Sequence, residues 1–96
     1  MTLRLRFTAE LWEHDGAGGW HFVTLPAPEG DEIRSTCEPR GFGSVRVRAT
    51  VGSSTWDTSV FPDTRSGSYV LPVKKPVRKA ENLEQGDHVI VIVDIG

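Results

Sequence analysis

Apolar and polar residues alternate with a period of two along most segments of this chain. From position 3 to position 11, and again from position 45 to position 51, the apolar residues fall on odd numbers and the polar residues on even numbers. Successive side chains of a β-strand point to opposite faces, so the pattern predicts strands with one face in a core and one in water. The chain is therefore predicted to be mainly β.

The alternation and the turn residues between segments predict about six strands and two short helices. Strands are expected at 3–11, 20–25, 44–51, 55–61, 68–71 and 88–95, and helices at 29–36 and 74–83. Gly52 and Ser53 supply a tight hairpin turn between two of the strands. The run at 88–95 is apolar at nearly every position, which predicts a central strand buried on both faces.

A weak internal repeat relates the two halves of the sequence. Leu25-Pro26, a short helix and Gly43 precede one strand, and Leu71-Pro72, a short helix and Gly86 precede another. Each half therefore predicts a strand–helix–strand unit. Two such units with two hairpin strands fit a closed or nearly closed sheet, because closure removes open edges. We expect one domain over residues 1–96, a small β-barrel of about six strands capped by these units.

A set of segments is distinctive in combination: 43–56, Ser59-Val60-Phe61-Pro62, Gly67-Ser68-Tyr69, Leu71-Pro72-Val73-Lys74, Arg78-Lys79 and Gly86-Asp87. These segments resemble those of a known family, the bacterial domain of unknown function 1905. The resemblance covers nearly the whole chain and implies a double-split β-barrel, in agreement with the repeat. Family members occur alone or joined to a segment of the bacteriocin-protection, OmpD-associated proteins, which is not recognised in this sequence. The resemblance implies no catalytic residues.

Basic residues are concentrated in one short segment, although the net charge is −2. Lys74, Lys75, Arg78 and Lys79 fall at the start of the second expected helix, where they could meet phosphates or a carboxylate. A solvated face of the helix is the competing interpretation.

Aromatic residues and a further arginine complete the predicted site. Trp20 flanks a glycine-rich loop, Tyr69 lies close to the basic segment in sequence, and Arg48 lies on the polar face of its strand. Trp56 shares a face with Val60, so core packing is the alternative for it. The predicted ligand-binding residues are Trp20, Arg48, Trp56, Tyr69, Lys74, Lys75 and Arg78.

Three functions stay open. We favour a non-catalytic binding domain, without a cofactor, for an anionic small molecule or an acidic partner. The first alternative is a nucleic-acid-binding, antitoxin-like dimer that uses Arg46, Arg48 and Lys75, an analogy drawn from the fold alone. The second is a small enzyme in the barrel mouth with His21, His88 or Tyr69 as acid–base groups. No metal-ligand spacing occurs, so no metal is expected.

Cysteine use and hydropathy predict the location. Cys37 is the only cysteine, so the fold cannot depend on an internal disulfide. No run of eighteen apolar residues is present, and the opening MTLRLRFTAE lacks the apolar core of a secretory signal. We expect a cytoplasmic protein that contacts no membrane, either a monomer or a homodimer.

Overall fold

The computed structural model of the chain describes residues 2–16, 18–37 and 43–96. Its elements are β1 (Leu3–Glu13), β2 (His21–Thr24), α1 (Ala27–Thr36), β3 (Val45–Val51), β4 (Ser54–Asp63), β5 (Ser68–Pro72), α2 (Lys75–Ala80) and β6 (His88–Ile95). Six strands and two helices within those ranges confirm the mainly β class. Over the same ranges, no helix combines the length and the apolar character needed to cross a membrane.

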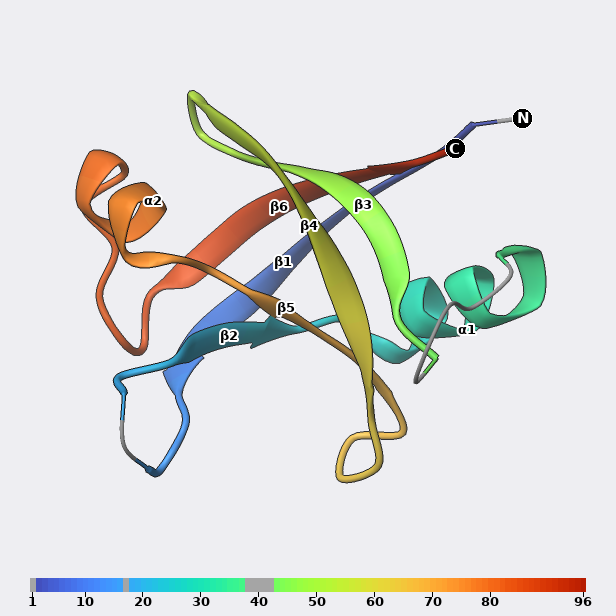
Figure 1. Ribbon diagram of the computed structural model, residues 1–96, viewed down its shortest axis with the longest axis horizontal. Helices are drawn as coiled ribbons and strands as arrows, with labels where there is room; N and C mark the ends of the chain where they lie inside the picture. Colours follow the sequence, from blue (N-terminus) through green and yellow to red (C-terminus); the bar gives the residue numbers. More distant parts are fainter. Residues whose placement is uncertain (1, 17, 38–42) are drawn as a thin grey trace.

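The strands close into a barrel in which each neighbouring pair is antiparallel (Figure 1). The order around the barrel is β1, β2, β5, β4, β3, β6 and back to β1. If β1 is exchanged with β4, β2 with β5 and β3 with β6, each neighbouring pair becomes another neighbouring pair of the same barrel. The topology therefore has an internal twofold symmetry, as the sequence repeat predicts.

Two long strands change partner along their length. β1 pairs with β6 over residues 3–10 and with β2 over residues 11–13. β4 pairs with β3 over residues 54–60 and with β5 over residues 61–63. Each of these strands is thus divided between two sheets, which is consistent with the double-split barrel that the family resemblance implies.

Apolar side chains from all six strands fill the interior of the barrel. Val23, Val60, Leu71 and Val91 have no exposed surface, and they belong to a single core cluster. The period-two alternation places these side chains inside the barrel, because a one-residue shift would turn them to solvent. The interior is therefore a packed core.

Strand β6 differs from its sequence prediction. It lies between β1 and β3, yet only Val89, Val91 and Val93 are buried, whereas Ile90 remains 51% exposed. A closed barrel has one inner face, and Ile90 lies on the outer face, where about half of its surface meets solvent. The prediction that this strand is buried on both faces is therefore wrong.

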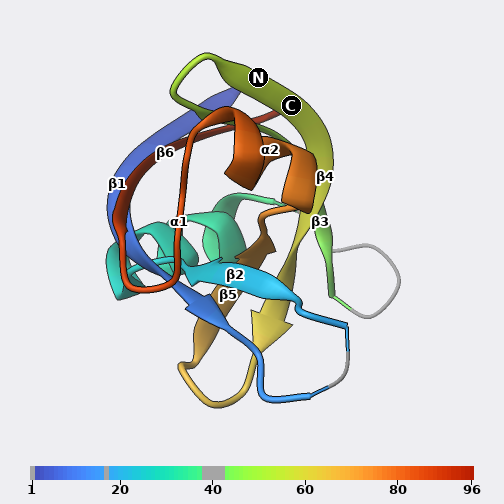
Figure 2. The ribbon, with the colours of Figure 1, turned by 90° about the vertical axis from the view of Figure 1, so that its left-hand side faces the viewer.

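The two helices lie on opposite sides of the barrel (Figures 1 and 2). Ile33 of α1 and Val77 of α2 are buried and join the core. α1 begins two residues earlier than predicted, with Pro28 in its first turn, where proline has no hydrogen bond to lose. α2 ends at Ala80, before its predicted limit, because Asn82 adopts a left-handed φ of 57°.

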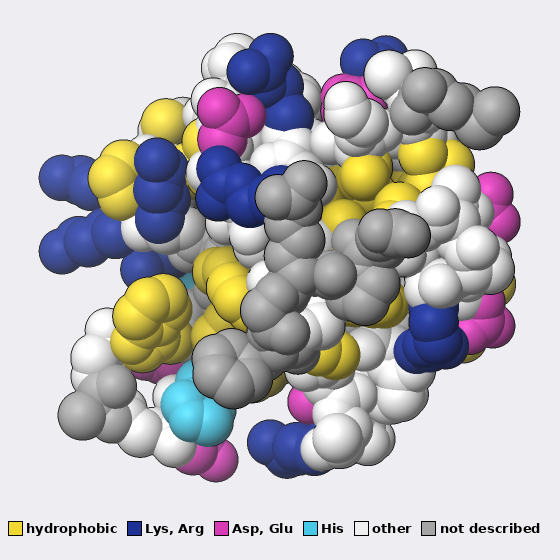
Figure 3. Space-filling view, turned by 45° about the vertical axis from the view of Figure 1, so that its right-hand side comes forward, with side chains coloured by type: hydrophobic (Ala, Val, Ile, Leu, Met, Phe, Trp, Pro, Cys, Tyr) yellow, Lys and Arg dark blue, Asp and Glu magenta, His cyan; other side chains and the backbone are white. Residues whose placement is uncertain are grey.

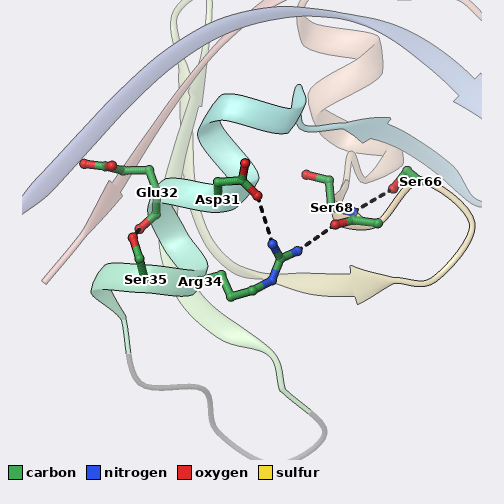
Figure 4. A network of polar contacts seen from close by, with 7 residues as sticks. Asp31, Glu32, Arg34, Ser35, Ser66 and Ser68 are labelled. Atoms are coloured by element: carbon green, nitrogen blue, oxygen red, sulfur yellow. Dashed lines mark hydrogen bonds and ion pairs between the residues drawn. The ribbon is translucent and has the colours of Figure 1, made fainter.

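Arg34 connects α1 to the turn between β4 and β5 (Figure 4). Its Nη2 donates to the carbonyl oxygen of Gly67 at 2.6 Å, and its Nη1 donates to Asp31 Oδ1 at 2.9 Å. The guanidinium carbon also lies 5.9 Å from the centre of the Tyr69 ring. On the same helix, Gly30 is buried against Ser68, so α1 approaches β5 where neither side chain is large.

The turn between β3 and β4 is held by the residue after α2. Glu81 Oε2 accepts hydrogen bonds from Ser54 Oγ at 2.6 Å and from Ser53 Oγ at 3.2 Å. Gly52 in this turn has a φ of 59°, so the predicted tight turn is present. The Ser54 hydroxyl is the main cause of a lowered Glu81 pKa, and hydrogen bonds from Ser53 contribute.

Candidate functional site

A cleft of about 250 Å³ lies between the β1–β2 loop and the segment that joins β5 to α2. It is lined by Gly18, Gly19, Trp20, His21, Pro72, Val73, Lys74, Lys75 and Arg78. In Figure 3, Lys and Arg side chains project together at the left edge of the molecule, beside exposed hydrophobic side chains. The cleft therefore joins cations from one segment to an aromatic ring from another.

Pairing between β2 and β5 brings these two segments together. Phe22 is opposite Pro72 in the register, and the Val73 N–H donates to the His21 carbonyl oxygen at 2.9 Å. Lys74 follows immediately, so the basic segment begins where the ladder ends. The backbone thus fixes the basic segment against the β1–β2 loop, across more than fifty residues of sequence.

Arg78 is the most constrained cation of the cleft. It is half-buried, and its Nε donates to the Val73 carbonyl oxygen at 3.1 Å. This bond fixes the guanidinium plane while the two terminal nitrogens keep donors for a ligand. A guanidinium held in this way is suited to a carboxylate or phosphate, which accepts two parallel hydrogen bonds.

Lys74 and Lys75 supply the remaining positive charge. Both are exposed, and across residues 2–16, 18–37 and 43–96 neither forms an ion pair. α2 has only six residues, fewer than two turns, so the charge of the cleft comes from side chains. A bound anion would meet these cations without first breaking an ion pair.

Trp20 forms the aromatic wall of the cleft. It is 57% exposed, and its ring lies nearly parallel to that of Phe22, with centroids 6.3 Å apart. Gly18 and Gly19 adopt positive φ values of 101° and 61°, a conformation that glycine adopts without strain. These glycines allow the loop to turn closely enough to place Trp20 beside the basic segment.

His21 contributes a directed acceptor to the same cleft. Its Nδ1 lies 2.7 Å from the Gly19 carbonyl oxygen, which can only accept. Nδ1 therefore carries the proton, and in the neutral ring Nε2 is left as an acceptor. The sequence analysis considered His21 only as an acid–base group, and its place beside the basic segment follows from the pairing of β2 with β5.

Three of the predicted binding residues lie elsewhere. Trp56 is 8% exposed and Tyr69 is 5% exposed, and both belong to the core cluster. Arg48 lies on the outer face of β3, where its Nε donates to Asp57 Oδ1 at 3.0 Å. The structure therefore brings together four of the seven residues: Trp20, Lys74, Lys75 and Arg78.

Arg48 lines a separate, shallow groove of about 690 Å³. Arg4 and Asp94 line it too, and Arg4 Nε donates to Asp94 Oδ1 at 2.7 Å. Hydrogen bonds from the arginines lower the pKa of both carboxylates, with Arg48 acting on Asp57 and Arg4 acting on Asp94. In this groove most of the charge is already paired across strands.

The groups considered for catalysis are dispersed. Tyr69 is buried in the core, His21 lies in the cleft, and His88 is exposed at the start of β6. Among the residues that the structure describes, no three His, Cys, Asp or Glu side chains are grouped to hold a metal ion. The described residues thus form a basic cleft with an aromatic wall, in which His21 is the only one of these three acid–base candidates.

Comparisons with known proteins identify one family. The family model described as "Domain of unknown function (DUF1905)" matches residues 7–93. A search of curated proteins finds no match. The matched region includes the whole cleft.

Proposed function

We propose that this chain, which belongs to the DUF1905 family, is a non-catalytic binding domain for a small anion that carries a flat apolar group. The observation that carries the proposal is the cleft in which Trp20 meets Lys74, Lys75 and Arg78. Two lysines that form no ion pair with any described residue and an oriented guanidinium suit the charged end of such a ligand. The exposed indole suits its flat part, because rings stack on an aromatic face.

The packed barrel supports a binding role over an enzymatic one. Within the described residues, core side chains fill the interior of the barrel, which gives a reaction site in the barrel mouth less support than a binding site on the surface. The proposal includes the cytoplasmic location expected from the sequence, where an unpaired cysteine such as Cys37 is usual.

A second candidate, duplex nucleic acid on the strand arginines, has less support. Arg46 and Arg48 line the shallow groove, whereas Lys75 lines the cleft, and the two depressions share no lining residue. The Arg48 charge is also paired with Asp57. One chain therefore does not present these three cations as a single surface.

The test uses three matched probes and nuclear magnetic resonance. Naphthalene-2-sulfonate provides a ring and a charge, methanesulfonate only the charge, and 2-naphthol only the ring. We expect the first probe to bind most tightly and to shift the indole N–H signal of Trp20, which is exposed, more than that of buried Trp56. Equal shifts at both indoles, or equal affinity for all three probes, would contradict the proposal.

Two lysine variants provide the matched control. Lys75→Ala removes a cation that lines the cleft, whereas Lys79→Ala removes an exposed cation of the same helix that does not. We expect only Lys75→Ala to weaken binding of naphthalene-2-sulfonate. Native mass spectrometry of protein purified from cells would then report both the mass of any retained ligand and whether the protein is a monomer or a homodimer.

A further inference from the structure

A row of aromatic rings leads out of the cleft along the outer face of the β1–β2 hairpin. Trp20 lies next to Phe22, and Phe22 lies next to Trp12 with ring centroids 5.1 Å apart. Trp12 and Phe22 are opposite each other in the strand register, so both rings belong to one face of the hairpin. We call Trp12, Phe22 and Trp20 the aromatic row.

The far end of the aromatic row reaches a second depression. A hollow of about 350 Å³ is lined by Trp12, Thr24, Asp63, Arg65 and Ser66. Trp12 Nε1 donates to Thr24 Oγ1 at 2.9 Å, which fixes the indole at the rim. The row therefore connects two hollows, one beside Trp20 and one beside Trp12.

Positive charge is available at both ends of the row. Lys74, Lys75 and Arg78 line the cleft, and Arg65 lines the second hollow. Asp63 also lines the second hollow, but its carboxylate accepts from the Ser66 N–H at 3.2 Å, and hydrogen bonding from Ser66 lowers its pKa. A linear ligand on this surface would meet cations, then rings, then a cation.

We propose that the aromatic row binds single-stranded nucleic acid, with its bases on the rings and its phosphates at Lys74, Lys75, Arg78 and Arg65. This inference rests on the proposed function and extends it, because the cleft then holds one unit of a longer anionic chain. Single strands bind where cations follow the backbone and aromatic rings accept successive bases. Duplex DNA keeps its base faces stacked inside the helix and cannot use the rings.

The test measures fluorescence anisotropy with a labelled twelve-nucleotide single strand. An abasic strand of equal length keeps every phosphate and lacks every base, and a duplex of the same sequence hides the bases. We expect the single strand to bind at least tenfold more tightly than either control. Equal binding of the abasic strand would overturn the proposal, because charge alone would then explain the affinity.

Four variants locate the binding surface. Trp20→Ala should weaken single-strand binding by about 5-fold to 150-fold, the range for loss of one base–ring stack. Ile90→Ala removes another exposed apolar side chain, on β6, and should change nothing. The slope of the logarithm of the binding constant against the logarithm of the salt concentration should become shallower by about 0.7 in Lys75→Ala, as expected for one lost phosphate contact. Lys79→Ala should leave this slope unchanged. Unchanged affinity in Trp20→Ala would refute the row as the site.

Arg65→Ala separates this inference from the proposed function. Arg65 is exposed in the β4–β5 turn and lines the second hollow but not the cleft. We expect the variant to weaken the single strand and to bind naphthalene-2-sulfonate normally. If naphthalene-2-sulfonate binds while the single strand behaves like the abasic strand, the row proposal fails and the cleft proposal stands. If naphthalene-2-sulfonate also fails to bind, both proposals fail.

Discussion

Replacing Gly30 with alanine tests how closely α1 packs on β5. An alanine Cβ at this position would lie 3.0 Å from Ser68 Cβ, and it would overlap the Ser68 hydroxyl oxygen. Rotation of the hydroxyl would relieve the overlap but not the contact between the two Cβ atoms, and Ser68 is only 5% exposed. Some displacement of α1 or β5 is therefore required.

Two effects of opposite sign determine the change in unfolding free energy. Alanine is favoured over glycine inside a helix by about 1 kcal/mol. Overpacking a well-packed contact costs about 1–3 kcal/mol. We expect Gly30→Ala to change stability by between about zero and 2 kcal/mol in the destabilising direction.

A second substitution isolates the packing effect. Ser68→Gly removes both Oγ and Cβ, which leaves Ser68 Cα, at 3.4 Å, as the nearest atom of that residue to a new Cβ at position 30. In this background Gly30→Ala should therefore stabilise the protein by about 1 kcal/mol, the helix preference alone. The double-mutant cycle should give a coupling of about 1–3 kcal/mol between the two positions.

Urea unfolding followed by circular dichroism measures all four proteins of the cycle. Gly16→Ala is the control, because an added Cβ there meets only the His14 ring at 3.5 Å, an ordinary contact. If the coupling is near zero and Gly30→Ala stabilises the protein both with Ser68 present and in the Ser68→Gly background, the contact between α1 and β5 is not too tight for a side chain, and the prediction is refuted. Ser68→Ala adds a check. The Ser68 hydroxyl has no hydrogen-bond partner among the described residues, so removing it should not lower the free energy of unfolding.

Two further predictions concern carboxylates with lowered pKa values. Glu81→Ala removes every acceptor of this side chain and should release the β3–β4 turn, seen as faster hydrogen exchange at the Ser53 amide. Identical exchange would contradict the hydrogen-bond assignment. The hydrogen bond from Arg4 lowers the pKa of Asp94 in the folded state below the unfolded value of about 3.9. The ionised carboxylate therefore stabilises the fold above about pH 4, and this stability is lost as the pH falls further. Asp94→Asn should thus flatten the acid side of the stability profile in urea titrations, and an unchanged profile would exclude the pair.

The strands and the core could be predicted because they follow local alternation. Trp56 and Val60 are an even number of residues apart on β4, so their side chains point to the same face. The alternation therefore gave core packing as the alternative to a ligand role for Trp56, and Trp56 is buried. The change of partner within β1 and β4 was not predicted. Adjacent apolar residues, Leu11-Trp12 and Val60-Phe61, interrupt the alternation close to each change of partner. Such a pair does not say which strand becomes the new partner, because that choice depends on long-range closure of the barrel.

The candidate site was predicted in part: Trp20 and the three cations of the basic segment do lie together, whereas Arg48, Trp56 and Tyr69 do not join them. The basic segment stands out in a net-acidic chain, whereas its position beside Trp20 depends on the β2–β5 pairing. Arg48 has the same residue type as Arg78, yet it is placed on β3 opposite Asp57 and pairs with it. Sequence alone does not distinguish an arginine paired across strands from one that lines a cleft.

The internal repeat indicates that the cations of the cleft are not required by the fold. When the two helices are aligned from their first residues, with Pro28 matched to Pro76, Ala27 and Gly30 of α1 occupy the places of Lys75 and Arg78. Both helices cap the same kind of barrel end, so the capping role does not require a cation at these places.

The two ends also differ in what occupies the space beside the helix. At the α1 end, Arg34 reaches the Gly67 carbonyl oxygen and closes the helix onto the β4–β5 turn. At the α2 end, the corresponding turn between β1 and β2 carries Trp20 and leaves a cleft. One scaffold thus supports a closed acidic end and an open basic end, and the proposed ligand gives the lysines of the open end a role that capping does not require.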